Sequence, residues 1–195
     1  PIQKLFKMKD GERIVSALSL DPRVIGNIAE DPKRPDYCPE IHGFAATSNG
    51  FALRFGLEQF AEPSTRSGRR FARVVPGSEV VGVVPVTGSE TILAISADCR
   101  AMVCPAEGIN YLSGAGKGVT LVKLAKTDRL LGFKASTGDR DLLVVETNRG
   151  ATKTISTVKY RTTSRGGRGI EIQKNGKIKT IIALPPGAPE PLDEE

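Results

Sequence analysis

The sequence predicts an all-β fold built from repeated four-strand units. Apolar and polar residues alternate with a period of two along most of the chain, a pattern typical of half-buried strands. Four such runs recur three times in the same order, about 50 residues apart, a spacing typical of blades arranged side by side in a disc. Helical periodicity is weak, and the stretch 56–63 predicts at most a turn.

The runs of each unit can be read off in order. The first runs are FAATS, ILAIS and LLVVET, and the second are GFALRF, CRAMVC and RGATKT. The third are RRFARVV, KGVTLVKL and RGIEIQK, and the fourth are EVVGVVPVTG, DRLLGFKASTG and GKIKTIIALPP. Three sets of positions match in phase: Gly50 with Cys99 and Arg149, Glu79 with Asp128, and Gly68 with Gly116 and Gly167.

The N-terminal residues fit the second half of the same unit. KDGERIVSALSLDP parallels PGSEVVGVVPVTG and places Glu12 in the Glu79 position. We therefore expect one domain, 1–186, followed by an acidic, Pro-rich and disordered tail, 187–195. The expected units of the domain are a truncated blade, 1–41, and complete blades at 42–90, 91–140 and 141–186.

Composition narrows the class of protein. With 39% apolar and 26% charged residues, the chain has the balance of a globular domain. It lacks an apolar run near the roughly 20 residues that cross a bilayer, and its N-terminus lacks signal-peptide features. The sequence begins without Met, which suggests a fragment or a processed piece. Three cysteines do not make a disulfide framework, so we expect a cytoplasmic protein with no membrane partner.

Positive charge concentrates toward the end of the chain. The net charge is +6, and residues 141–186 hold nine Lys and Arg against three acidic residues. The tail carries four carboxylates, on Glu190, Asp193, Glu194 and Glu195. This distribution suits a polyanion binder whose tail competes with the ligand, and a solvated basic face is the alternative.

A glycine-rich basic loop precedes the third strand of each complete unit. The loops are 65–71, 113–119 and 163–170, and equivalent loops of blades should share one rim. Glycine lets a backbone approach a polyanion, and cations along an arc can hold successive phosphates. The predicted contact residues are Arg66, Arg69, Arg70, Arg73, Lys117, Lys123, Lys159, Arg161, Arg165 and Arg168. The alternative is that the glycines serve tight turns only.

Other phosphate and nucleic-acid sites fit less well. SGAGKG lacks the first glycine and the final Ser or Thr of a Walker loop, and no GxGxxG opens a βαβ unit. Single-strand binders interleave cations with aromatic residues, which make up only 5% of this chain. No recognition helix for the major groove is evident. The pattern therefore favours the backbone of duplex DNA, with any specificity arising from bendability.

Catalytic and metal chemistry find little support in the sequence. Cys38, His42, Cys99 and Cys104 could be imagined as a zinc site, but Cys99 and Cys104 should lie on opposite faces of a strand. His42 is the only histidine, and no Ser-His-Asp or Cys-His pairing stands out. We therefore expect no catalytic centre, metal or cofactor in this chain.

The repeats and their loops together resemble the C-terminal domain of the bacterial type IIA topoisomerase A subunit, found in gyrase and topoisomerase IV. TSRGGRGIEI, SGAGKGVTLVKLAKTDRLLGF and GFALRF carry the resemblance, which covers nearly all of residues 1–186. It implies a β-pinwheel, partial or open, whose blades exchange strands and whose basic rim binds and bends duplex DNA. It also implies a nucleoid-associated parent enzyme that uses ATP and Mg²⁺ outside this chain. The parent's partners would be the topoisomerase B subunit, together with a second copy of the parent in a dimer, both contacted through the missing N-terminal part.

The chain departs from the strict gyrase motif, Gln-Arg-Arg-Gly-Gly-Lys-Gly. Thr163 and Ser164 stand where gyrase has Gln-Arg, and Arg168 replaces Lys. Loss of the gyrase motif, its location upstream of Pro1, and a topoisomerase IV-like protein are all compatible with this difference. The alternative to DNA binding is a protein-interaction scaffold with a propeller-like fold, whose basic rim docks an acidic partner.

Overall fold

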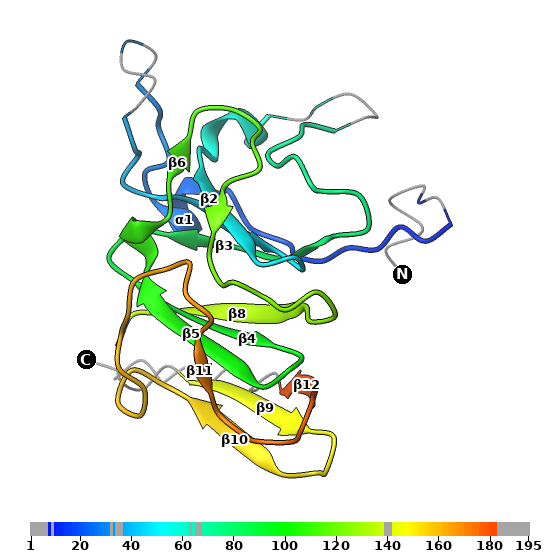
Figure 1. The fold of residues 1–195 in the computed structure, drawn as a ribbon. Helices are drawn as coiled ribbons and strands as arrows, with labels where there is room; N and C mark the ends of the chain where they lie inside the picture. The colour runs from blue at the N-terminus through cyan, green and yellow to red at the C-terminus, as the bar shows by residue number, and fades with distance from the viewer. Residues whose placement is uncertain are drawn as a thin grey trace, which may run out of the picture.

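Three β-sheets, here called blades 1, 2 and 3, follow one another along the described part of the chain. In Figure 1 blade 1 lies at the top, blade 2 in the middle and blade 3 at the bottom. The computed structural model describes residues 8, 10–31, 33, 37–62, 64, 68–138 and 142–182. The predicted all-β, blade-like fold is confirmed.

Blade 1 has the strand order β3-β1-β2-β6, with β7 also paired to β2. Its strands are β1 (His42–Thr47), β2 (Phe51–Phe55), β3 (Val80–Val86), β6 (Tyr111–Leu112) and β7 (Val119–Thr120). The central strand β1 pairs antiparallel with both neighbours, so that Ala45 lies opposite Leu53 on one side and Val83 on the other.

Blades 2 and 3 repeat this plan. Blade 2 has the order β11-β5-β4-β8, and blade 3 has the order β10-β9-β12. The blade 2 strands are β4 (Thr91–Ser96), β5 (Arg100–Pro105), β8 (Leu130–Ser136) and β11 (Ile170–Glu171). The blade 3 strands are β9 (Leu143–Thr147), β10 (Thr152–Ile155) and β12 (Ile178–Ile182).

The third runs of the second and third repeats leave their own blades, and each completes the preceding blade. β7 comes from the second repeat but pairs with β2 of blade 1, with Val119 opposite Ala52. β11 comes from the third repeat but pairs with β5 of blade 2, with Ile170 opposite Ala101, and Figure 1 shows it running beside β5. This exchange of strands is the pinwheel arrangement that the family resemblance implied.

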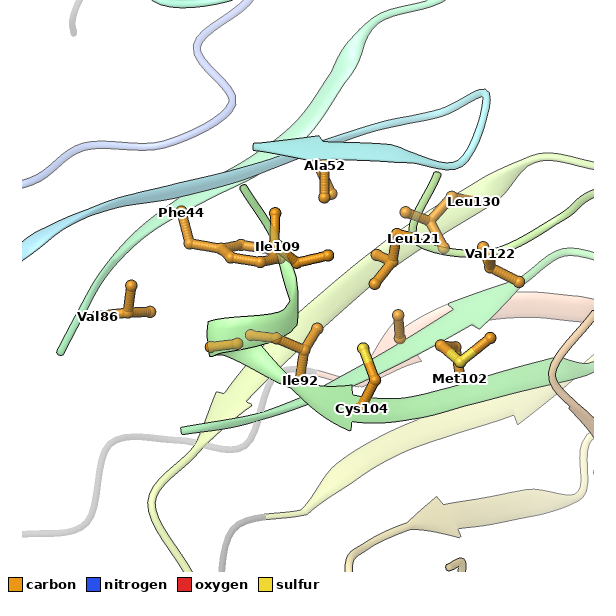
Figure 2. Packing of buried hydrophobic residues seen from close by; sticks show 13 residues of the cluster. Phe44, Ala52, Val86, Ile92, Met102, Cys104, Ile109, Leu121, Val122 and Leu130 are labelled. Carbon is orange, nitrogen blue, oxygen red and sulfur yellow. The ribbon is translucent and has the colours of Figure 1, made fainter. Parts of the chain in front are cut away.

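Apolar contacts hold adjacent blades together. All six residues of β1 and five of the six in β4 are buried, because these central strands are covered on both faces. Figure 2 shows the layer between blades 1 and 2, which contains Phe44, Ile92 and Leu121, the residue that follows the exchanged strand β7. Each such fully buried side chain stabilises the fold by about 1.5–3 kcal/mol. A second layer, which includes Leu93 and Val145, joins blades 2 and 3.

The N-terminal segment runs beside β3, the fourth strand of the first repeat. It occupies the position that the fourth strand of another repeat would take there. The Val83 amide donates to the Ser16 hydroxyl at 2.9 Å, and Arg13 pairs with Glu79 at 2.7 Å. The segment 12–21 forms no regular ladder with β3. Gly11 and Gly77 both have positive φ and are therefore equivalent. Arg13 and Glu79 each follow their glycine by two residues, so Arg13, rather than the predicted Glu12, stands in the Glu79 position.

The turn between the first two strands corrects the predicted phase of the third repeat. Gly50, Cys99 and Gly150 have φ of 82°, 60° and 77°, and each donates its amide to the residue three positions earlier. Gly150, not Arg149, is therefore the equivalent of Gly50. The prediction was wrong because Cys99 occupies a left-handed position that usually takes glycine, which hid the pattern.

The fourth strand corrects a second pair of positions. The backbone carbonyls that accept from Ser48 and Ala97 belong to Glu79 and Arg129, so Glu79 corresponds to Arg129. Asp128 instead matches Ser78, because each binds the turn of the first hairpin through its side chain.

Helical structure is confined to short segments in the described residues. The α-helix α1 (Pro22–Ile25) begins at Asp21, whose carboxylate caps the Arg23 amide at 3.0 Å. The 3-10 helices are η2 (Glu58–Phe60), within the turn predicted at 56–63, and η3 (Ala106–Gly108). Among these residues, no helix is long and apolar enough to span a membrane.

Candidate nucleic-acid interface

The structure connects the three glycine-rich loops in series. The Arg73 amide donates to the Gly116 carbonyl at 2.8 Å, which joins the segment after the first loop to the second loop. In the same way, the Lys123 amide donates to the Gly167 carbonyl at 2.8 Å and joins the second loop to the third. The repeated bond means that successive loops lie side by side. The second loop lies at the seam between blades 1 and 2, and the third lies at the seam between blades 2 and 3.

A glycine at the start of the third run gives each loop its shape. Gly118 and Gly169 have φ of 76° and 70°, and each presses against a carbonyl of the preceding blade. Gly68, with φ of 68°, stands three residues before the apolar Phe71, as Gly118 and Gly169 stand before Leu121 and Ile172. Gly68 therefore matches Gly118 and Gly169, not Gly116 and Gly167 as the sequence suggested.

Most of the predicted contact residues are available to solvent. Arg165 is half-buried, and Arg66 lies outside the described residues. The remaining predicted cations are exposed: Arg69, Arg70, Arg73, Lys117, Lys123, Lys159, Arg161 and Arg168. The loops thus carry exposed positive charge at each seam, which is what contact with an extended polyanion requires.

Two of the arginines also hold their loops in place. The Arg69 guanidinium donates to the backbone carbonyls of Gln59 and, at 2.9 Å, Glu62, which ties the first loop to η2. Arg165 donates from Nε to the Gly108 carbonyl at 2.6 Å and ties the third loop to η3. Both side chains therefore have a positioning role besides their charge.

Lys123 and Arg168 line a common hollow at the seam of blades 2 and 3. The hollow has a volume of about 300 Å³ and also contains Arg100, Asp98 and Asp128. The two carboxylates are already engaged by the protein. Asp98 pairs with a lysine of the following repeat, and the Asp128 carboxylate accepts from the Asp98 amide at 3.0 Å. Of the three lining cations, Lys123 and Arg168 are exposed, whereas Arg100 is half-buried.

The other predicted lysines lie against aromatic rings. The Lys117 ammonium sits 4.1 Å from the centre of the Phe51 ring, a cation–π contact that orients it across the first seam. The Lys159 ammonium lies 5.6 Å from the Tyr160 ring. Lys159 and the exposed Arg161 belong to the segment leading into the third loop.

Sequence reasoning missed two arginines that the fold brings to the seams. Arg100 reaches the hollow from the start of β5 and pairs with Glu171 of the exchanged strand at 3.4 Å. Arg54 holds the first seam, because its Nε donates to the Ile109 carbonyl at 2.6 Å. Neither residue belongs to a glycine-rich loop, so the motif gave no signal for them.

Cys99, Cys104 and His42 are buried in the core, and Cys38 is partly exposed. Cys99 and Cys104 pack in different apolar layers, on opposite faces of blade 2 as expected. Burial raises the pKa of Cys104 to about 11, only partly offset by Arg165. The buried His42 ring lies 2.9 Å from the Pro39 carbonyl and 3.4 Å from the Cys38 sulfur. No cluster of three metal-binding side chains occurs among the described residues.

Known proteins share this architecture. The chain resembles the C-terminal domain of DNA topoisomerase IV, with a TM-score of 0.75, 17% identity, and coverage of 94% of this chain and 54% of that one. It also resembles the DNA gyrase A C-terminal domain, with a TM-score of 0.67, 19% identity, and coverage of 94% and 58%. At these identities, the similarity establishes the fold.

Sequence comparison gives the family. The DNA gyrase A protein of Helicobacter pylori (strain J99) is 26% identical over 188 residues, and that of Escherichia coli (strain K12) is 23% identical. These matches span 94% of this chain but only 22% and 20% of the two gyrase proteins. The family model described as "DNA gyrase C-terminal domain, beta-propeller" matches residues 44–87, 112–136 and 141–184, which together make up more than half of the chain. The chain therefore belongs to the DNA gyrase C-terminal domain family.

Proposed function

We propose that this chain binds and bends duplex DNA along its seam loops, as the C-terminal domain of a type II topoisomerase A subunit. The observation that carries the proposal is the serial connection of the three glycine-rich loops, which sets exposed cations at successive seams. A stiff duplex that follows such a series around a disc of blades must bend. Bending 20–30 base pairs costs on the order of 1–6 kcal/mol, so contacts at more than one seam are needed to offset it.

The same proposal extends to the longer protein. In it, an A-subunit dimer acts with a B subunit in the bacterial cytoplasm, cleaves both DNA strands with a tyrosine, and uses ATP and Mg²⁺ bound outside this chain. Gyrase and topoisomerase IV are both compatible with this assignment. The domain's part in that reaction is to hold one DNA segment in a bent path.

Salt dependence of duplex binding tests the proposal. Affinity for labelled duplexes of random sequence should fall with rising salt, with a log–log slope of about −0.9 for each neutralised phosphate. The double variant Lys123→Ala/Arg168→Ala should bind all sequences more weakly and have a slope shallower by roughly 1.8, because two phosphate contacts are removed.

A charge-matched control separates local contact from net charge. Arg23 and Lys179 lie in α1 and β12, outside the loops, and their double alanine variant changes the total charge by the same amount. Equal weakening by the two double variants would reject the seam loops as the contact surface. If an acidic polypeptide binds as tightly as DNA at the same salt and competes with it, the scaffold alternative is favoured instead.

A further inference from the structure

Two of the five asparagines in this chain are followed by glycine, at Asn49–Gly50 and Asn175–Gly176. In such a pair the glycine nitrogen can attack the asparagine carboxamide, because glycine has no side chain to shield that nitrogen. The other three asparagines precede residues with large side chains, which hinder this attack. The reaction needs a carboxamide that is free to rotate and a backbone amide that is free to react, so the fold decides which pair is reactive.

The fold engages both reacting groups of the first pair. The Asn49 carboxamide oxygen accepts hydrogen bonds from the Thr47 hydroxyl at 2.7 Å and the Ser78 hydroxyl at 3.1 Å. The Gly50 amide donates to the Thr47 carbonyl at 2.9 Å. Gly50 is also buried at the first seam, where its carbonyl accepts from the Leu121 amide at 2.9 Å. Attack on Asn49 therefore requires local opening of this seam.

The second pair lies in the turn before β12. Asn175 is exposed, and Gly176 is half-buried. Among the described residues, neither the Asn175 carboxamide nor the Gly176 amide has a hydrogen-bond partner. The carboxamide can therefore rotate toward the Gly176 nitrogen without breaking a hydrogen bond of the described structure.

Asn175 stands at a corner that the first repeat makes with glycine. Hairpin turns in blades 1 and 3 donate in the same way to the carbonyls of Glu79 and Lys177, so Asn175 is the equivalent of Gly77. Both residues are left-handed, with φ of 53° at Asn175 and 78° at Gly77. Asparagine tolerates this conformation better than most residues other than glycine. The backbone of the corner thus explains why asparagine is accepted there.

We propose that Asn175 is a site of spontaneous deamidation in the folded chain, whereas Asn49 is protected. The Gly176 nitrogen forms a bond to Cγ of Asn175, and the carboxamide nitrogen leaves as ammonia. Water then opens the resulting cyclic succinimide at either carbonyl, which gives aspartate or isoaspartate. Both products carry a new negative charge, and isoaspartate also adds one atom to the backbone.

The added atom lies just before the contacts that join β12 to its neighbours. The Lys177 amide donates to the Asn148 side chain at 3.2 Å, and the Lys177 ammonium pairs with Asp98. The Ile178 amide donates to the Ala97 carbonyl at 2.9 Å. A longer corner cannot keep all of these contacts in register, so conversion to isoaspartate should loosen β12 from blade 2.

Mass spectrometry of the chain during incubation at pH 8 tests the site. Digestion after glutamate leaves each Asn-Gly pair inside a long peptide. The peptide with Asn175 should gain the mass that replacement of NH₂ by OH produces, roughly tenfold or more faster than the peptide with Asn49, because Asn49 reacts only after local opening. In urea, where neither pair is held by the fold, the two rates should become similar.

The Asn175→Gly variant removes the reactive group and keeps the left-handed corner, since the first repeat has glycine there. This variant should show no mass gain in the same peptide. Its Tm should stay constant during the incubation, whereas the Tm of the parent chain should fall as isoaspartate accumulates.

Three results would overturn the proposal. Equal rates at Asn49 and Asn175 in the folded chain would show that the fold does not select between them. A difference that persists in urea would assign the selection to the flanking sequence instead. A converted chain with unchanged Tm would contradict the effect on β12. None of these measurements involves DNA, so the site and the proposed function are tested separately.

Discussion

Replacing Gly169 by alanine should destabilise the domain far more than the same change at Gly68. The two glycines have nearly the same backbone conformation, with φ of 70° and 68°. They differ in their surroundings, because only Gly169 faces a carbonyl of the preceding blade. The pair therefore separates the effect of the left-handed backbone from the effect of the seam.

The structure sets the expected magnitudes. A left-handed alanine costs about 1–2 kcal/mol, and its stiffer unfolded chain returns about 0.4–1 kcal/mol, so Gly68→Ala should lower stability by about 0–1.6 kcal/mol. At Gly169 the new Cβ would lie 2.5 Å from the Ala101 oxygen, whereas ordinary contact begins at 3.4 Å. The seam must open by close to this difference of about 0.9 Å, and overpacking of this kind adds about 1–3 kcal/mol.

Urea unfolding of both variants and the parent chain measures these costs. The extra 1–3 kcal/mol corresponds to a further fall in Tm of roughly 2–12 °C for a domain of this size. Gly118→Ala should repeat the result at the first seam, since a Cβ there would overlap the Ala52 carbonyl. Equal destabilisation at Gly68 and Gly169 would refute the role assigned to the close approach.

Three further predictions concern the buried polar groups and thiols. Burial lowers the pKa of His42, and Arg54 adds to this effect, while the Pro39 carbonyl and Glu90 oppose it. Below pH 6.5 the unfolded state therefore binds more protons than the folded state, and the free energy of unfolding should decline from pH 7 toward pH 5. His42→Gln should reduce this decline, as measured by urea unfolding at a series of pH values. An unchanged pH dependence in the variant would contradict this assignment. The buried Glu90 carboxylate accepts hydrogen bonds from the Thr87 and Gly88 amides at 2.8 and 2.9 Å. Glu90→Ala should therefore lower the free energy of unfolding at pH 7 by about 1–3 kcal/mol. A change near zero would show that these amides find other acceptors. Iodoacetamide at pH 8 should label the partly exposed Cys38 before the buried Cys99 and Cys104, as followed by mass spectrometry; simultaneous labelling would mean that the seams open readily.

The sequence predicted the content of each repeat better than the pairing of its strands. The runs FAATS and ILAIS identified the strands β1 and β4. This was possible because the tendency of a segment to form a buried strand is set by the residues of that segment itself. The exchange of β7 and β11 was implied only by the family resemblance, since alternation along a strand does not name the partner of that strand. The third runs form short strands, and the first of them, RRFARVV, forms only the bridge at Ala72.

The candidate interface was predictable in kind but not in detail. The glycine and arginine motif located the three loops, and whether their cations bind DNA stays a prediction. The anchoring of Arg69 and Arg165 to backbone carbonyls could not be foreseen, because η2 and η3 meet the loops only in the folded chain. Arg54 and Arg100 were missed for the same reason, since their partners are more than 50 residues away in the sequence.

Strand exchange also explains why the cations lie where they do. A third strand that crosses to the preceding blade must begin at the seam, so the loop before it cannot lie over the centre of a blade. The spacing between successive loops is then fixed by the packing of whole blades, through buried layers such as that of Phe44 and Ile92. The positions of the cations thus follow from the apolar packing between the blades. The glycine-rich loops connect the cations to the packed strands.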